Sequence, residues 1–315
     1  MGNQIGSFQS DGWRLNGCVH LPNEESQQRI GVVIVHENTK FGTHSLLRQI
    51  ADAFAASGFY AFRYENRGSC DSPGDCELTF ENRVADACAA VHFFKTEYNL
   101  DKVLFWGLCM GGAVAVHTSA RLKAPFKPAG VILCNLLADP VYATTPELNY
   151  RSVTVSAYLR KGLTGNPWNR LRAFVSDPDY RRNMVQAVLN VAGNNRSNQN
   201  LRDLRKQIGQ VGPLLAQYDG PSLLVYGDAD SHWSSFTQRI NRGDRLQLSK
   251  MKSPPKIALM LDGDHMFHSL SQTTEVIRIS VDWATAFRNG QNLVGEPEHI
   301  NAIFASATAA VGAAQ

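Results

Sequence analysis

The stretch VLFWGLCMGGAVAV, residues 103–116, carries the strongest structural signal in the chain. A run of apolar residues leads into GLCMG, residues 107–111, and small apolar residues follow. This order predicts a buried strand that turns sharply into a helix, with Cys109 at the apex of the turn. Such a turn projects its central side chain clear of the backbone, and the positive end of the helix beneath it favours a thiolate.

Strands and helices alternate on both sides of this turn. Apolar runs predict buried strands at 30–36, 59–65, 101–107, 129–135, 221–227 and 256–262. Apolar residues at three-to-four spacing predict helices at 44–57, 80–97, 109–121 and 270–288. Residues 4–9 and 13–21 are predicted as antiparallel edge strands. Buried strands joined by helices form a mainly parallel sheet with right-handed crossovers, so the fold class is α/β.

The alternation breaks between residues 139 and 219. This span is polar and contains the run NNRSNQNLRDLRKQ. It is longer than an ordinary connection, which indicates an inserted structure. We therefore predict a core made of residues 1–138 and 220–289, a helical lid at 139–219, and an Ala-rich C-terminal tail at 290–315.

Composition excludes several classes of partner. The chain has 315 residues, and its 31 basic and 28 acidic side chains give a net charge of +3. This balance does not favour nucleic acid or an anionic membrane. No apolar run reaches the ~18 residues of a membrane-spanning helix, and the start of the chain lacks the apolar core of a signal peptide, so we expect a cytoplasmic protein. The cysteines lack the spacing of metal-ligand pairs, and no metal or organic cofactor is expected.

A thiolate at the apex of the turn needs a base and donors for an oxyanion. The candidate base is His265, which closes the run IALMLDGDH at the end of a predicted strand. The candidate acid that orients the base is Asp230, in the turn GDAD after another strand. Asp230 is preferred to Asp228 because it lies further out on the loop. Carboxyl ends of parallel strands meet at one edge of a sheet, so Cys109, Asp230 and His265 are predicted to lie together.

The loop after the first buried strand contributes further candidates. In this arrangement the loop offers the backbone N–H of Asn38 to the oxyanion, beside the N–H of Met110. Glu37 is a further candidate in this loop, and its structural interpretation is a loop charge. His36 is an accessory candidate at the same place.

The candidates also have purely structural interpretations. Cys109 could be a small buried residue in a tight turn, and His265 a loop histidine with satisfied hydrogen bonds. Asp230 could be a solvated turn acid or the N-cap of the next helix. His232 and Trp233, just past the acid, are expected to pack against the lid rather than touch substrate.

The chain resembles the α/β-hydrolase superfamily over residues 1–289. The resemblance rests on the turn around Cys109, the segment YENRGSCDSPG (64–74), the acid turn and the late histidine. The chain departs from that pattern in having cysteine where serine is usual, and Cys70 where glycine is usual. The resemblance implies an α/β-hydrolase fold and the order nucleophile, acid, histidine along the chain.

Three groups of this superfamily are similar in finer detail. Dienelactone hydrolases carry cysteine at this turn and a Gln-Glu pair where this chain has His36 and Glu37. This resemblance implies that Glu37 contacts the thiol and serves as a local proton acceptor. The run WGLC is similar to hydrolases associated with exosortase systems. Dieckmann cyclases of tetramate biosynthesis also use cysteine, but take their acid from a loop where this chain has Asn135 and Asp139.

The sequence therefore predicts an acyl-transfer enzyme that works through a thioester on Cys109. With water as acceptor it hydrolyses an ester, a lactone or a thioester. Its substrate would be a small acyl compound, a carrier-bound thioester included. With an amine or carbon nucleophile as acceptor it would be an acyltransferase or a cyclase. A further alternative is a non-catalytic binding protein on a hydrolase fold.

Overall fold

The computed structural model describes residues 2–36, 42, 44–74, 79–143, 195–241, 251–296 and 298. The chain divides into two compact units. The larger comprises Met1–Tyr142 and Gln207–Gln315, and the smaller comprises Ala143–Lys206. All of the site described below belongs to the larger unit.

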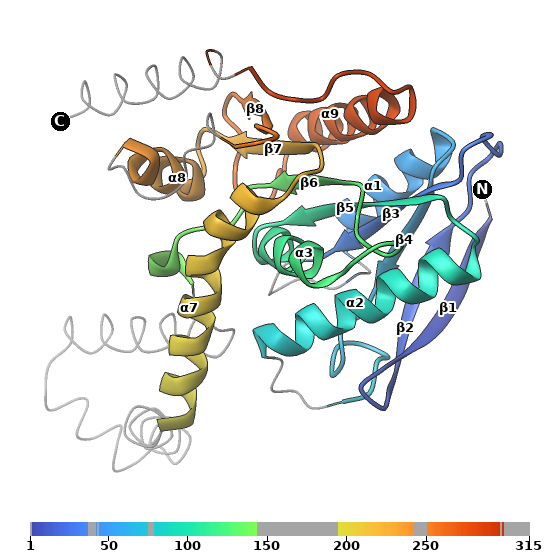
Figure 1. Cartoon of the computed structure of the whole chain (residues 1–315), viewed down its shortest axis with the longest axis horizontal. Coiled ribbons are helices and arrows are strands. Elements are labelled where there is room, and N and C mark those ends of the chain that lie inside the picture. The colour runs from blue at the N-terminus through green and yellow to red at the C-terminus, as the bar shows by residue number, and fades with distance from the viewer. Residues whose placement is uncertain are drawn as a thin grey trace, which may run out of the picture. The chain divides into compact units, whose positions relative to one another are not determined.

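An eight-stranded sheet forms the centre of the larger unit (Figure 1). Its order is β1-β2-β4-β3-β5-β6-β7-β8. Strand β2 is antiparallel to both of its neighbours, and the pairs from β4 to β8 are all parallel. The strands are β1 Asn3–Ser10, β2 Trp13–His20, β3 Ile30–Val35, β4 Tyr60–Tyr64, β5 Lys102–Leu108, β6 Gly130–Cys134, β7 Ser222–Gly227 and β8 Lys256–Met260.

Helices cover both faces of this sheet (Figure 1). Helices α1 and α9 contact each other on one face, and α2 and α3 contact each other on the opposite face. The helices are α1 Ser45–Ala56, α2 Phe80–Glu97, α3 Met110–Arg121, the 3-10 turn η1 Pro140–Tyr142, α7 Asn195–Gln217, α8 Ser231–Asn241 and α9 Leu270–Arg288.

The central strands form the core. Strands β3, β6 and β7 are buried along their whole length, as expected of strands covered by helices on both faces. Trp106 of β5 is fully buried, and its indole N–H donates to the hydroxyl of Ser280 on α9 over 3.0 Å. The polar atom of the largest core side chain is therefore satisfied, and the contact ties the middle of the sheet to one helical layer.

This architecture confirms the predicted fold class and a mainly parallel sheet. Within the span predicted as the lid, residues 207–217 of α7 belong to the larger unit. Ile208, Val211 and Leu215 recur at three-to-four spacing and are buried, so this part of the helix has an apolar face to bury. Most of the predicted lid, 144–194, and the end of the predicted tail lie outside the described residues.

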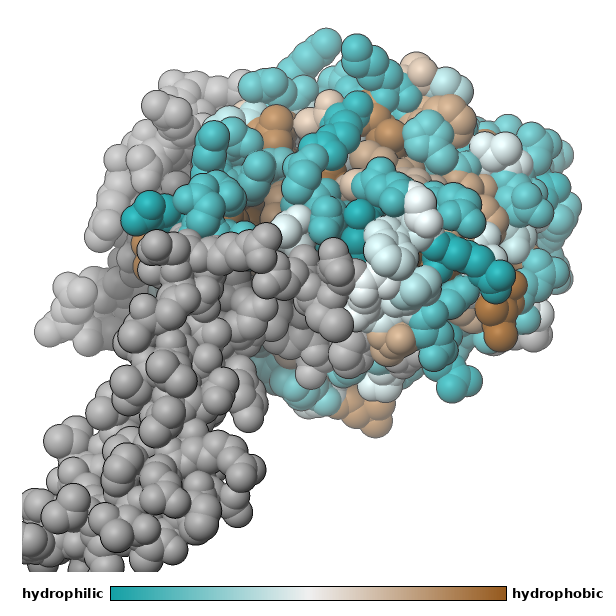
Figure 2. Space-filling model, turned by 90° about the horizontal axis from the view of Figure 1, so that it is seen from below, coloured by the Kyte–Doolittle hydropathy of each residue, from teal (hydrophilic) through white to brown (hydrophobic). Residues whose placement is uncertain are grey.

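In the part of the chain that the structure describes, no helix combines the length and apolar character needed to cross a bilayer. The described surface in Figure 2 is mainly hydrophilic, with small hydrophobic areas between polar residues.

Candidate active site

Cys109 lies at a sharp turn between β5 and α3, and we call residues 107–111 the elbow. Its backbone has φ 53° and ψ −116°, a strained conformation for a residue other than glycine. A Cβ atom on Gly107 would lie 2.7 Å from the carbonyl oxygen of Gly111, and one on Gly111 would collide with the carbonyl of Val35. Both glycines are therefore required for the turn to form. The Cys109 N–H donates to the carbonyl of Cys134 over 2.9 Å, which holds the strained residue in place.

Asp230 follows β7 and is almost completely buried. Its side chain is 2% exposed, and Oδ1 accepts the backbone N–H of His232 over 3.1 Å. Asp230 thus caps the start of α8, as its structural interpretation predicted, but the same carboxylate also serves the site. Asp228 is exposed to solvent. The carboxylate of Asp230 is therefore buried at the start of α8, whereas that of Asp228 faces solvent.

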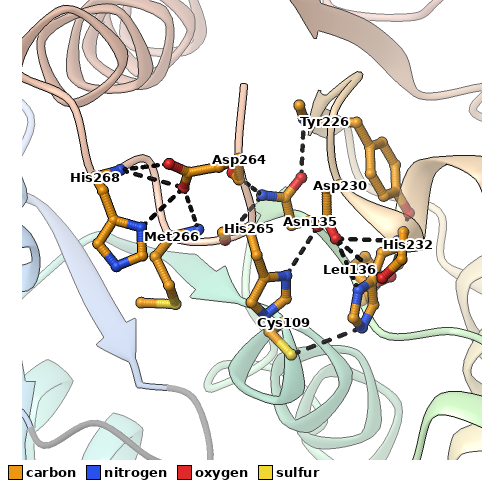
Figure 3. A network of polar contacts seen from close by, with 12 residues as sticks. Cys109, Asn135, Leu136, Tyr226, Asp230, His232, Asp264, His265, Met266 and His268 are labelled. Atoms are coloured by element: carbon orange, nitrogen blue, oxygen red, sulfur yellow. Dashed lines mark hydrogen bonds and ion pairs between the residues drawn. The ribbon is translucent and has the colours of Figure 1, made fainter. Parts of the chain in front are cut away.

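Two histidines share the carboxylate of Asp230 (Figure 3). Nδ1 of His265 lies 2.9 Å from Oδ2, and Nδ1 of His232 lies 3.1 Å from Oδ1. The two rings stack with their centroids 4.6 Å apart. Because the carboxylate accepts from each Nδ1–H, it fixes both rings with Nε2 turned away from it.

The thiol of Cys109 faces both rings. Its Sγ lies 3.9 Å from Nε2 of His232 and within 4.8 Å of a ring nitrogen of His265. One ligand-type atom from each of Cys109, His232 and His265 lies within 4.8 Å of the other two. Among the described residues this is the group of three that could hold a metal ion, although the sequence predicted no metal site.

His232 has polar contacts that the sequence did not predict. Besides the expected packing against the lid span 139–219, it contacts both Asp230 and the thiol. The ring of Tyr142 lies 5.7 Å from its ring, on the side of η1. Trp233, the next residue, instead packs against Tyr226. The sequence feature that could have indicated this contact is the position of His232, two residues after Asp230. In the first turn of α8, a side chain at that position can reach the residue that caps the helix.

The histidines lower the pKa of the Cys109 thiol. Burial disfavours a thiolate at Cys109, but hydrogen bonds from His232 and His265 outweigh burial and lower its pKa. Burial disfavours charge on the two rings as well. Hydrogen bonds to Asp230 and Cys109 outweigh that effect and raise the pKa of His232 to about 9 and of His265 to about 10.

Cys134 and Asp230 show how burial and hydrogen bonds from histidine act on a pKa in this site. Cys134 is also fully buried but has burial alone acting on it, and its pKa is raised well above the usual value. For Asp230, burial again opposes the charged form, yet the hydrogen bonds from the two histidines hold its pKa well below the usual range. The contacts thus shift Cys109 and Asp230 towards their anionic forms, and His232 and His265 towards their imidazolium forms.

Asn135 clamps the loops that carry the acid and the base. It follows β6 with φ 41°, and its Nδ2 donates to the carbonyls of Asp264 and His265 over 3.2 and 3.0 Å. Its Oδ1 accepts the N–H of Gly227 over 2.9 Å. One buried amide therefore ties the ends of β6, β7 and β8 together (Figure 3).

The substitution Asn135→Asp is expected to destabilise the protein by about 1–3 kcal/mol, because a carboxylate cannot donate to the two carbonyls. We also expect kcat to fall about 10- to 100-fold as His265 loses its position. Urea unfolding and steady-state kinetics measure the two effects. Asn292→Asp is the matched control, since exposed Asn292 accepts a single backbone N–H that a carboxylate can also accept. Equal effects of both substitutions would remove the positioning role of Asn135.

His265 does not contact a carboxylate in the loop from which the Dieckmann cyclases take their acid. Asn135 is an amide bonded to backbone groups. Asp139 accepts the N–H of Val141 through Oδ1 over 2.9 Å. The carboxylate that His265 contacts comes instead from Asp230, after β7.

The remaining predicted site residues have mixed outcomes. Met110 begins α3 and is buried, and as the first helical residue its N–H has no intrahelical acceptor. Asn38 and Glu37 lie outside the described residues. His36 is buried, and its Nε2 accepts from Nδ2 of Asn66 over 2.8 Å, which ties the end of β3 to the loop after β4.

The sheet order, the elbow and the site at the carboxyl ends of the strands define an α/β hydrolase. Residues 27–243 match the model of a family described as serine aminopeptidase, S33. The chain belongs to this family and is an enzyme of the hydrolase class. The family name specifies serine, whereas this chain has Cys109 at the elbow.

Solved structures show the same fold. An α/β serine hydrolase homologue from Coxiella burnetii is 14% identical, with a TM-score of 0.57 over 90% of this chain and 97% of its own. Est1E from Butyrivibrio proteoclasticus is 14% identical, with a TM-score of 0.57 over 89% and 97%. An esterase from Pyrococcus furiosus is 14% identical, with a TM-score of 0.56 over 93% and 92%. A search of curated proteins found no match.

Proposed function

We propose that this hydrolase transfers acyl groups through a thioester on Cys109, with water as the acceptor. Its substrate is a small ester, lactone or thioester, and a carrier-bound thioester belongs to the same chemical class. One observation carries the proposal: the buried carboxylate of Asp230 holds two imidazole rings against a thiol at a strained elbow. A purely structural cysteine needs neither ring.

In the first step the thiolate of Cys109 attacks the carbonyl carbon of the substrate and forms a C–S bond. The carbonyl oxygen becomes an oxyanion, which the N–H of Met110 stabilises together with the proposed second donor, the N–H of Asn38. The tetrahedral intermediate collapses by breaking the bond to the leaving group. The imidazolium of His265 gives its proton to the leaving oxygen or sulfur.

In the second step neutral His265 takes a proton from water, and the resulting nucleophile attacks the thioester. The C–S bond breaks, the carboxylic acid leaves, and Cys109 returns to the thiolate. Asp230 keeps Nδ1 of His265 protonated throughout, so that Nε2 is the atom that gives and takes protons.

His232 acts in this scheme as a second cation beside the sulfur. When His265 has given up its proton, the imidazolium of His232 still faces Sγ at 3.9 Å. It therefore stabilises the thiolate both as nucleophile and as leaving group, at a site where burial alone would favour the neutral thiol.

The cysteine itself favours a second acceptor class. A thioester reacts with amines and carbanions more readily than with water, so an acyltransferase or cyclase would use the same first step. Turnover in aqueous buffer with a small amine at millimolar concentration tests this. Product that partitions to amide indicates an acyltransferase, and product that stays carboxylate indicates a hydrolase.

Alkylation distinguishes this enzyme from a binding protein on a hydrolase fold. In EDTA-containing buffer at pH 6, we expect iodoacetamide to label Cys109 at least ~10-fold faster than the other thiols, because two imidazoles stabilise its thiolate. His265→Ala and His232→Ala should each slow the labelling, and His268→Ala, which removes an exposed ring paired with Asp264, should not. Peptide mapping that finds slow labelling, or labelling insensitive to both rings, would contradict the proposal.

A further inference from the structure

The second histidine gives the site a property that acyl transfer does not require. A nucleophile with one histidine offers two ligand atoms to a metal ion, whereas Cys109, His232 and His265 offer three. These atoms lie within 4.8 Å of one another, and the separation of Sγ from Nε2 of His232 is 3.9 Å. Tetrahedral Zn²⁺, with Zn–S of about 2.3 Å and Zn–N of about 2.0 Å, needs about 3.5 Å between such atoms. The separations, at most 4.8 Å, would have to shorten to about 3.5 Å, which rotation of the side chains can supply.

The kind of ligand selects the kind of metal. A thiolate and two imidazoles suit Zn²⁺ and its substitute Co²⁺, and they do not suit Mg²⁺ or Ca²⁺, which prefer oxygen ligands. Three protein ligands also leave the fourth tetrahedral position open for water or substrate.

Asp230 supplies an independent argument. Histidines that bind metals donate their other ring N–H to a carboxylate or carbonyl, which fixes the ring and its tautomer. Here each oxygen of one buried carboxylate contacts the Nδ1 of one ring. Both Nε2 atoms are thereby available on the side of the thiol, as Figure 3 shows for the positions of Cys109, His232 and His265. Asp230 thus orients both ligand rings before a metal ion binds.

We propose that Cys109, His232 and His265 form a three-ligand Zn²⁺ site, and that Zn²⁺ bound there reversibly stops acyl transfer. Zn²⁺ occupies the sulfur lone pair that attacks the substrate and the ring nitrogen that moves the proton. The inhibitory consequence rests on the proposed function, whereas the metal site itself does not. Removal of the metal by a chelator restores the free thiol.

Co²⁺ titration of the EDTA-treated, chelator-free protein tests the site without any substrate. We expect one equivalent to produce a thiolate-to-Co²⁺ charge-transfer band in the near ultraviolet and strong visible bands of four-coordinate Co²⁺, both abolished by added Zn²⁺. His232→Ala and His232→Gln should weaken binding at least ~100-fold, and Cys109→Ala should remove the charge-transfer band. Asp230→Asn should weaken binding about 10- to 100-fold.

The control is His268→Ala, which removes a nearby exposed histidine and should bind Co²⁺ as the parent protein does. Thermal unfolding of each variant shows that it is folded. No charge-transfer band in the parent protein, or a band that survives both His232 substitutions, would overturn the site.

Alkylation and acylation of the same preparations separate the two proposals. If Cys109 is labelled and acylated in EDTA but no Co²⁺ spectrum appears, the metal inference fails and the acyl-transfer proposal stands. If Co²⁺ binds but the metal-free thiol neither labels fast nor takes an acyl group, the acyl-transfer proposal fails and the metal site stands. Faster acyl turnover with bound Zn²⁺ would overturn inhibition.

Discussion

The substitution Cys109→Ala is expected to lower kcat by at least ~10⁴-fold and to leave the fold intact. Without sulfur no thioester forms, and neither histidine can replace the missing nucleophile. The loss of stability should be small, because alanine is smaller than cysteine and retains the backbone hydrogen bonds at the elbow. Hydrolysis of a p-nitrophenyl ester and thermal unfolding measure the two quantities on the same preparation.

Cys88→Ala is the matched control for the loss of a thiol. Cys88 lies on α2, and burial raises the pKa of its thiol to about 11, so it is not expected to react. This control should keep kcat within about twofold of the parent value. Retention of more than a hundredth of the parent activity by folded Cys109→Ala would show that another group carries the reaction.

The substitution Asp230→Asn is expected to lower kcat by about 10³- to 10⁴-fold. An amide cannot accept from both Nδ1–H groups as a carboxylate does, so the two rings lose their orientation and part of their positive charge. The effect should exceed that of His232→Ala, because Asp230 holds both rings, and should stay below that of removing His265, which moves the proton. A pre-steady-state burst should also disappear, since thiolate formation and leaving-group protonation both slow.

Asp228→Asn is the control that distinguishes a role of the Asp230 carboxylate from a role of the turn in which both residues lie. Asp228 is exposed, and its backbone N–H, which the substitution preserves, donates to the carbonyl of Met260. We expect kcat to change by less than about twofold. A similar loss in both variants would mean that the turn, and not the carboxylate of Asp230, supports the reaction.

Much of the fold could be predicted because the signals are local. Burial on both faces makes β3, β6 and β7 continuous apolar runs, and this pattern does not depend on distant residues. The elbow is likewise local, since Gly107 and Gly111 are required by close backbone approaches. The boundary within α7 could not be predicted, because its polar sequence hides the short apolar face at 208–215.

The site was only partly accessible to sequence reasoning. Cys109, Asp230 and His265 follow from the rule that loops at the carboxyl ends of strands meet at one edge. The contact of His232 with the thiol depends on the direction of the α8 axis relative to the sheet. The spacing of apolar residues along the sequence does not reveal that direction. The clamp by Asn135 depends on a positive φ and on three strand ends arriving together, and both are properties of the assembled sheet.

The central claim, a thioester on Cys109, is tested most directly by mass spectrometry of the intact protein. The metal-free enzyme is mixed with a p-nitrophenyl ester, quenched in acid within the first turnover and digested for peptide mapping. The account predicts one added acyl group, located on Cys109, removed by neutral hydroxylamine and absent from Cys109→Ala. It also predicts that His265→Ala accumulates little of this species. An acyl group on any other residue, or turnover by the parent enzyme with no acylated protein at any time within the first turnover, would contradict it.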